Sequence, residues 1–323
     1  MCTAISYKTA DHYFGRNLDL EYRYQETVTI TPRKYPFRFN DHPDITDHYA
    51  IIGMATVSNG YPLYYDATNE YGLSAAGLNF PGNACYCEPR KNADNVTAFE
   101  LIPWLLSQCK NVDQAKNLLK KINITNIPFS QEFALTPLHW MVSDSNTSIV
   151  IEPESDGVRI YDNPVGVLTN NPPFPFHLDN LKNYLNLTSE EPTNRFSNKI
   201  TLHPYSRGMG AMGLPGDLSS ASRFIRAAFT KLNSVSNDAE TASVSQFFHI
   251  LGAVTQQCGC VKVNGAFEKT IYSCCCNTDK GIYYYKTYHN SQISAVKLFG
   301  EDLECSSLKT FPLNDTQQIH YQN

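Results

Sequence analysis

The sequence has few of the features that mark membrane-spanning, secreted or nucleic-acid-binding proteins. Its most apolar stretch, 49–57, is far shorter than the roughly 20 residues that span a bilayer. Lys and Arg number 26 against 31 Asp and Glu, so neither nucleic acid nor a membrane is expected as a partner. Hydrophobic residues make up 42% and charged residues 18%, which is typical of a folded chain. Without a linker or repeat, we expect one domain over 1–323.

The chain also lacks the patterns of secretion and of common cofactor sites. The first 20 residues contain no basic region followed by an apolar one, which predicts no signal peptide and a cytoplasmic protein with reduced thiols. No Cys-x-x-Cys pair, H-E-x-x-H, Walker A or G-x-S-x-G motif occurs. Residues 208–213 spell G-x-G-x-x-G, but no strand precedes them and Pro215 opposes a helix, so no dinucleotide site is predicted.

What the chain does have is ten cysteines, and Cys2 differs from the others by its position. Aminopeptidases remove Met1 when the second residue is small, which would leave a thiol and a free α-amine on one residue. An α-amine has a pKa of roughly 7.7–8.0 and suits a general base near neutrality. Cys2 could therefore be a nucleophile that carries its own base, an ordinary residue at a chain end, or the partner of a histidine. Cys109 and 274–276 are predicted to be small buried hydrophobic residues.

The segment after Cys2 predicts a β-hairpin of strands 2–7 and 12–19 joined by a polar turn. This hairpin returns Arg16 and Asp19 to the neighbourhood of Cys2. Strict alternation would place Arg16 and Asp19 on opposite faces of the strand. If both serve Cys2, the strand must end or bulge near Leu18.

The remaining pattern alternates blocks of strands with paired helices. Thr97-x-x-Glu100 and Asn111-x-x-Gln114 predict the starts of two helices. Such blocks indicate sheets enclosed by helical layers, with a loop-rich stretch over 172–204. The predicted helices are 98–108, 111–122, 222–231 and 245–254, and the predicted strands are 49–57, 73–79, 138–143, 148–152, 158–161, 165–169, 270–276, 281–289 and 292–298.

An ordered set of short motifs resembles the choloylglycine hydrolases, a family of bile salt hydrolases and penicillin V acylases within the N-terminal nucleophile superfamily. The resemblance implies an α+β fold, a four-layer αββα sandwich, and amide hydrolysis through a thioester on Cys2, without cofactor or metal and with only Met1 removed. The matching motifs are Met1-Cys-Thr3, Phe14-Gly-Arg-Asn-Leu-Asp19, Asn69-Glu-Tyr-Gly-Leu73, Gly77-Leu-Asn-Phe-Pro81, Leu138-His-Trp-Met141, Gly166-Val-Leu-Thr-Asn170, Gly213-Leu-Pro-Gly-Asp217, Ala221-Ser-Arg-Phe-Ile-Arg226 and Gly281-Ile-Tyr-Tyr-Tyr285.

The resemblance assigns a role to each matching residue. Arg16 is the cation beside the thiol, where a fixed positive charge favours thiolate. Asp19 orients the α-amine. Asn79 and Asn170 are the amide donors to the oxyanion of the tetrahedral intermediate, and the neighbouring Asn171 is the local alternative to Asn170. The helix residue Arg223 orders the polar network, with Arg226 as its alternative.

The resemblance also implies an amphiphilic amide substrate and a homotetramer. Bile salt hydrolases tend to have asparagine where Asn79 stands, so conjugated bile salts are favoured over penicillin V or N-acyl homoserine lactones. Ser58 stands where some bile salt hydrolases carry an aromatic residue, and Phe129 and Phe133 stand where aliphatic residues are common. A catalytically silent protein that binds sterol-like molecules and retains Met1 is the alternative from another class. An apolar steroid pocket is predicted to be lined by Leu18, Leu20, Tyr24, Val57, Phe129 and Phe133.

Overall fold

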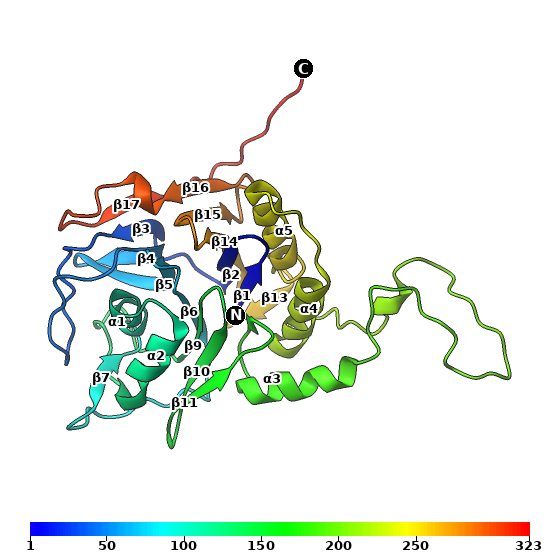
Figure 1. Cartoon of the computed structure of the whole chain (residues 1–323), viewed down its shortest axis with the longest axis horizontal. Coiled ribbons are helices and arrows are strands. Elements are labelled where there is room, and N and C mark those ends of the chain that lie inside the picture. Colours follow the sequence, from blue (N-terminus) through cyan, green and yellow to red (C-terminus); the bar gives the residue numbers. More distant parts are fainter.

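The computed structural model describes residues 1–323 as two β-sheets stacked between two layers of helices (Figure 1). The first sheet has seven strands, in the order β12 (Val167–Leu168), β1 (Cys2–Lys8), β2 (His12–Leu20), β14 (Ala266–Asn277), β15 (Ile282–Thr287) and β16 (Ser294–Lys297), with β13 (Val261–Val263) beside β14. The second has eight, in the order β11 (Gly157–Asp162), β10 (Ser148–Glu154), β9 (Leu138–Ser143), β6 (Ser74–Asn79), β5 (Tyr61–Asn69), β4 (Ile51–Ser58), β3 (Thr27–Thr31) and β17 (Lys309–Pro312). A separate parallel pair joins β7 (Asp94–Thr97) to β8 (Ile122–Thr125).

Each sheet is covered on its outer face by helices. α1 (Leu101–Gln108) packs on β4, β5 and β6, followed by α2 (Val112–Leu118), while α4 (Ser220–Asn233) and α5 (Glu240–Gly252) pack on β1, β2 and β14. α3 (Phe174–Leu181) contacts α4. The predicted αββα sandwich is therefore confirmed. None of these helices combines the length and the apolar character that a membrane crossing requires.

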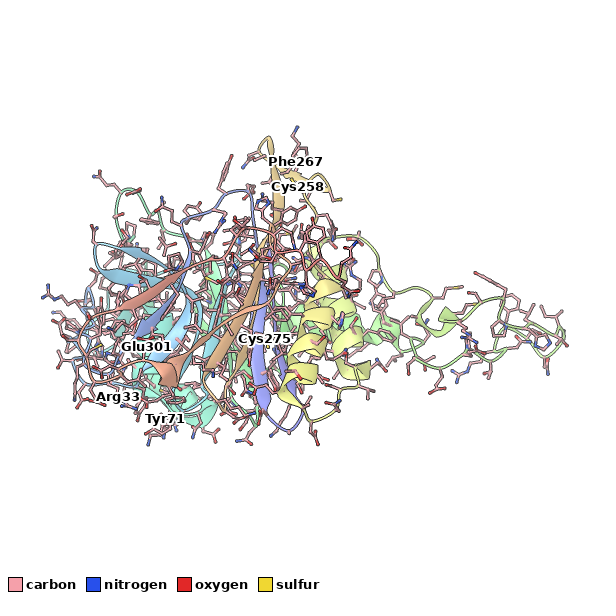
Figure 2. All side chains as sticks on the ribbon, turned by 90° about the horizontal axis from the view of Figure 1, so that it is seen from above. Arg33, Tyr71, Cys258, Phe267, Cys275 and Glu301 are labelled. Carbon is pink, nitrogen blue, oxygen red and sulfur yellow. The ribbon has the colours of Figure 1, made fainter.

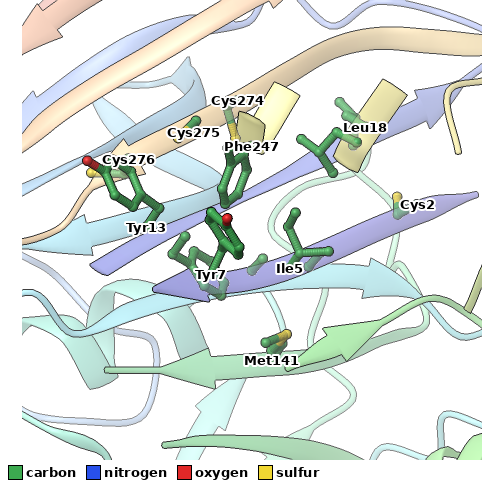
Figure 3. Close-up of a cluster of buried hydrophobic side chains, with 14 of the residues drawn as sticks. Cys2, Ile5, Tyr7, Tyr13, Leu18, Met141, Phe247, Cys274, Cys275 and Cys276 are labelled. Carbon is green, nitrogen blue, oxygen red and sulfur yellow. The ribbon is translucent and has the colours of Figure 1, made fainter. Parts of the chain in front are cut away.

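The alternation of side chains in the eight-stranded sheet divides the core into two parts. On β6, Ala76 and Leu78 point toward the seven-stranded sheet, whereas Ala75 packs under α1 and α2. The larger part lies between the sheets and extends to α4 and α5 (Figure 3). It contains the cysteines at 274–276, which are at most 1% exposed, and Cys109 is buried in the other part. Their prediction as buried residues is confirmed.

The hairpin of β1 and β2 forms with Cys2 opposite Leu18 and Ala4 opposite Arg16. On the other side of β2, the pairing with β14 changes register between Thr270 and Tyr272, opposite Asp19 and Leu18. A β-bulge of this kind increases the local twist and redirects side chains. The strand β2 itself neither ends nor bulges at Leu18, because it continues to Leu20, so this expectation is wrong and the irregularity lies on the partner strand β14.

Several elements differ from the predicted ones. Asn111 caps α2 by accepting a bond from the Gln114 N–H at 2.9 Å, but the helix ends at Leu118 because Ile122 begins β8 beside β7. The strand β5 was not predicted, since Pro62 weakens its strand pattern, and α3 occupies part of the stretch expected to be loop. Pro175 lies in the first turn of this helix, where proline is tolerated.

After α3 the chain leaves the body as a long arm, residues 185–216, which extends well beyond the sheets and helices (Figures 1 and 2). The arm carries exposed apolar side chains, among them Phe196 and Tyr205, each 82% exposed. The G-x-G-x-x-G segment lies in the arm without a preceding strand, as predicted. There Gly210 approaches the opposite side of the arm so closely that a Cβ would lie 2.1 Å from the Glu190 carbonyl oxygen.

Candidate active site

A cavity of about 460 Å³ opens beside the start of β1, and 15 of its 22 lining residues are hydrophobic. Cys2, Arg16 and Asn79 are among its lining residues, and Glu21, Glu132 and Thr136 add further polar groups. Five of the six predicted pocket residues line it, namely Leu18, Leu20, Tyr24, Phe129 and Phe133. Val57 does not, because β4 lies one strand farther from β6 and the intervening β5 fills that wall. The wall residues that sequence reasoning missed include Leu63, Tyr65, Pro128, Leu135, Leu138 and Trp140.

Cys2 is fixed by its backbone on two sides. Its side chain and backbone together are only 2% exposed. Its N–H donates to Asn170 Oδ1 at 2.8 Å, and its carbonyl oxygen accepts from Arg223 Nη1 at 2.5 Å. The Met1 residue precedes it, so the Cys2 nitrogen is here a peptide amide. No histidine lines the cavity, which removes the Cys–His dyad left open by the sequence.

Arg16 lies on β2 and is completely buried. Its Nη1 donates to the carbonyl oxygens of Tyr65 at 3.0 Å and Gly77 at 2.5 Å, whereas its Nη2 has no hydrogen-bond partner. Burial lowers the pKa of Arg16, but the acidic groups of Cys2, Tyr272, Asp66 and Cys274 together outweigh burial and raise it above its ordinary value. The guanidinium is therefore a permanent charge with one nitrogen still free to donate.

Asp19 and Glu268 form an acidic pair around the chain start. The Met1 ammonium lies 2.9 Å from Glu268 Oε2 and donates to the Asp19 carbonyl oxygen at 2.7 Å. Thr270 donates to Asp19 Oδ1 at 2.6 Å, while Asp19 Oδ2 and Glu268 Oε1 have no partner. Burial raises the pKa of both carboxyl groups. Glu268 was not predicted, because only the pairing of β14 with β2 brings it to this position.

The two asparagines play different parts in the geometry. Asn170 uses both ends of its amide within the protein: Oδ1 accepts from Cys2 N–H and from Arg223 Nη2 at 2.7 Å, and Nδ2 donates to the Asn79 carbonyl oxygen at 2.7 Å. This differs from the expected oxyanion role. Asn79 is the last residue of β6 and lines the cavity together with Cys2. Its side-chain amide, unlike that of Asn170, is therefore the one available to donate there. Asn171 instead donates to the Pro81 carbonyl oxygen at 2.6 Å, away from Cys2.

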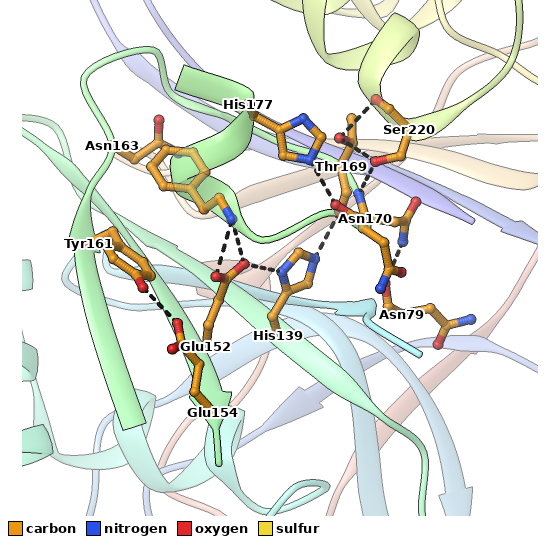
Figure 4. A network of polar contacts seen from close by, with 12 residues as sticks. Asn79, His139, Glu152, Glu154, Tyr161, Asn163, Thr169, Asn170, His177 and Ser220 are labelled. Atoms are coloured by element: carbon orange, nitrogen blue, oxygen red, sulfur yellow. Dashed lines mark hydrogen bonds and ion pairs between the residues drawn. The ribbon is translucent and has the colours of Figure 1, made fainter. Parts of the chain in front are cut away.

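A buried polar frame holds Asn170 in place (Figure 4). His139 bonds the Thr169 carbonyl oxygen and Glu152, each at 2.9 Å, and His177 bonds the Asn170 carbonyl oxygen at 2.9 Å. The Asn170 N–H donates to Ser220 Oγ at 2.8 Å. Because every one of these groups is nearly or fully buried, the loop that carries Asn170 has little freedom to move.

Arg223 and its alternative, Arg226, have different surroundings in the structure. Arg223 is completely buried and contacts Cys2 and Asn170. Burial lowers its pKa, although Asp19 partly opposes this change. Arg226, one turn along α4, donates to the carbonyl oxygens of Pro215, Asp217 and Ala253. Arg223 therefore belongs to the site, and Arg226 anchors the end of the arm.

A thiol at the start of a central strand, enclosed between two sheets and two helical layers, defines an N-terminal nucleophile hydrolase fold. The family model of linear amide C–N hydrolases, choloylglycine hydrolase family, matches residues 2–311. The chain therefore belongs to the choloylglycine hydrolase family and is a C–N hydrolase of linear amides.

Its relatives cover the whole chain. It is 56% identical over 324 residues to the bile salt hydrolase/transferase of Lactiplantibacillus plantarum and 37% identical over 329 residues to that of Clostridium perfringens, with 100% of each chain covered. Among solved structures, a conjugated bile acid hydrolase from Clostridium perfringens has a TM-score of 0.93 at 36% identity, with both chains covered completely. Penicillin V acylase from Agrobacterium tumefaciens shares the fold, with a TM-score of 0.75 at 18% identity over 97% of this chain and 92% of that one.

Proposed function

We propose that the protein is a bile salt hydrolase that cleaves the amide bond of glycine- or taurine-conjugated bile acids with Cys2 as its nucleophile. The observation that carries this proposal is the cavity, where one thiol and one buried cation stand at the end of a predominantly apolar hollow. An apolar pocket with a few polar groups at one point fits a steroid acyl group with a single amide.

In this proposal removal of Met1 gives Cys2 a free α-amine. The amine takes the thiol proton while Sγ attacks the amide carbon, and the carbonyl oxygen becomes an oxyanion. Asn79 Nδ2 donates to that oxyanion. The intermediate then collapses to a thioester as the C–N bond breaks, and the α-ammonium returns its proton to the departing glycine or taurine. Water, deprotonated by the same amine, hydrolyses the thioester and releases the bile acid.

The remaining polar residues hold these groups in position. We assign Arg16 to the thiolate, since its free Nη2 is buried near Cys2. Asp19 orients the α-amine, and Asn170 accepts from the same nitrogen in the present arrangement. Arg223 ties Cys2 to Asn170. Preorganised contacts of this kind stabilise charge that develops during reaction without further reorganisation.

The charges around the cavity favour an acyl group inside and an anionic leaving group outside. The charged residues that line the cavity are Arg16, Glu21 and Glu132. A carboxylate or sulfonate would be repelled by the two glutamates, whereas a neutral steroid would gain from burial. Penicillin V and N-acyl homoserine lactones are the alternative substrates within the same chemistry.

The test is a direct comparison of kcat/KM for glycocholate, taurocholate and penicillin V. We expect a conjugated bile salt to be the preferred substrate. A preference for penicillin V of more than about tenfold, or roughly 1.4 kcal/mol in transition-state stabilisation, would overturn the substrate assignment. Intact mass spectrometry separates the catalytically silent alternative, because a protein that retains Met1 has no α-amine on Cys2.

We further propose that the protein is a single-domain homotetramer of the bacterial cytoplasm, as the family resemblance implies. The exposed apolar side chains of the arm support self-association, because apolar groups displayed on a projection are stabilised by burial against another copy. Light scattering should give about four times the mass of one chain. Replacing Phe196 and Tyr205 by serine should lower that mass if the arm forms the interface.

A further inference from the structure

A further buried carboxylate, Asp66 on β5, takes no part in the proposed reaction. Asp66 is 2% exposed. The hydroxyls of Tyr272 and Tyr283 donate to its two oxygens, each at 2.6 Å, and the Cys274 thiol donates at 3.4 Å. All three donors come from β14 and β15 of the other sheet. Burial raises the pKa of Asp66, whereas the Arg16 charge and these three donors oppose that rise and favour the ionised form.

Asp66 and its three donors are connected to Arg16 by two hydrogen bonds that involve backbone atoms. The Arg16 N–H donates to Cys274 Sγ at 3.3 Å, and Arg16 Nη1 donates to the carbonyl oxygen of Tyr65, the residue before Asp66. No carboxylate lies within 4.0 Å of the guanidinium, so Arg16 forms no salt bridge. Both Asp66 and Cys2 nevertheless act electrostatically on Arg16. Asp66 is thus a buried counter-charge for Arg16, although the two side chains share no direct hydrogen bond.

We propose that Asp66 is a positioning residue that offsets part of the Arg16 charge and thereby sets how strongly the Cys2 sulfur is held as thiolate. This inference rests on the proposed role of Cys2 and deepens it. A cation without a counter-charge would favour thiolate more strongly, but the nucleophilicity of a thiolate falls as its thiol becomes more acidic. Asp66 therefore balances the fraction of thiolate against its reactivity.

A test of the effect of Asp66 on the Cys2 thiolate must leave the other charged and titratable residues around Cys2 and Arg16 unsubstituted. Some surround the chain start, and others surround the guanidinium. They are Asp19 of β2, Glu21 after it, Arg223 of α4, Glu268 of β14, Tyr65 of β5, and the three donors to Asp66.

The experiment is Asp66→Asn with iodoacetamide labelling measured against pH. Because Cys85, Cys258 and Cys260 are exposed and will also react, labelling is quantified on the N-terminal peptide by mass spectrometry. We expect the midpoint for Cys2 to move to lower pH by roughly half a unit to one unit, while the midpoint for Cys258 stays fixed. Tyr283→Phe is the matched control, because it removes one hydrogen bond to Asp66 but keeps the charge, and its Cys2 profile should match wild type.

A Cys2 profile that coincides with wild type in Asp66→Asn would overturn the inference, as would an equal shift in Tyr283→Phe. If Asp66→Asn does not fold, thermal unfolding of Arg16→Leu and of Arg16→Leu/Asp66→Asn supplies a second test. Without the cation, Asp66 becomes an unpaired buried charge, so the double variant should have the higher Tm. A lower Tm for the double variant counts against the pairing.

The two proposals fail in different ways. If Arg16→Leu moves the Cys2 midpoint to higher pH while Asp66→Asn does not move it, only the role of Asp66 is lost. If Cys2→Ala retains turnover, the proposed function itself is lost.

Discussion

The surroundings of Cys2 and the side chain of His12, at opposite ends of the β1–β2 hairpin, differ in how their buried polar groups are satisfied. At the Cys2 end, Arg16 Nη2, Asp19 Oδ2 and Glu268 Oε1 are buried without hydrogen-bond partners. At the opposite end, His12 is as deeply buried, but Ser6 and Thr278 bond its two ring nitrogens, each at 2.8 Å. That end opens into a hollow of about 230 Å³ with no hydrophobic lining, beside Lys8 and Lys231.

The comparison teaches that burial of a titratable group is not by itself a sign of a reaction centre. An unsatisfied buried polar atom costs about 1–3 kcal/mol, and a fold tolerates several of them where substrate groups will use them. Both ring nitrogens of His12 have hydrogen-bond partners and carry no such cost, so we interpret His12 as a structural residue. Substitutions around Cys2 should therefore mainly lower turnover, whereas substitution of His12 should mainly change stability.

The largest effect is expected from Cys2→Ala. Loss of the nucleophile should reduce kcat/KM for a conjugated bile salt by on the order of 10⁴-fold or more, because no thioester can form. The Tm should change little, since only a sulfur at the cavity wall is removed. The assay is steady-state release of glycine or taurine with circular dichroism as the folding check. Cys258→Ala, which removes an exposed thiol, is the control and should keep full activity.

Asn79→Ala should have the next largest effect. Removing one oxyanion donor typically lowers kcat by about 10²–10³-fold, and KM should move much less because the donor acts on charge that appears only after attack. Asn83→Ala, four residues farther along in the turn, is the matched control. A variant that raises KM and leaves kcat intact would show that Asn79 binds substrate and does not stabilise the intermediate.

The smallest effect on turnover is expected at the other end, from His12→Gln. Burial lowers the pKa of His12 to about 4, below the roughly 6.5 of an unfolded chain, so the unfolded state binds the extra proton between these values. Its contribution to stability is complete above pH 6.5 and falls as pH drops toward 4, by about 2 kcal/mol at pH 5. Urea unfolding at pH 7.5 and pH 5 should show a smaller pH dependence in His12→Gln. An identical pH dependence would contradict a neutral buried His12.

Some of the site could be predicted from the sequence because its signals are local. Cys2 is marked by its position, and the hairpin that returns Arg16 and Asp19 follows from two short strands and a polar turn. The family resemblance favoured Arg223 over Arg226, but no local pattern separates them, since both lie on one helix and only the packing of α4 on β1 buries the first. Val57 was misplaced for a related reason: strand order decides which side chains reach the cavity, and strand order is not local.

The sequence by itself predicted Cys2 as the nucleophile and Arg16 as its neighbouring cation, and it predicted the sandwich that the structure has, because each prediction depends on residues close together in the chain or on an ordered set of motifs. Only the tertiary structure places Asn170 against Cys2 and Asn79, Glu268 beside the chain start, and Asp66 in the same buried network as Arg16. These depend on contacts between residues far apart in the chain, such as the ion pair between Met1 and Glu268, which are 267 positions apart. Hydrogen-bond partners over such separations are fixed by sheet register and by the stacking of the two sheets, which no local pattern encodes.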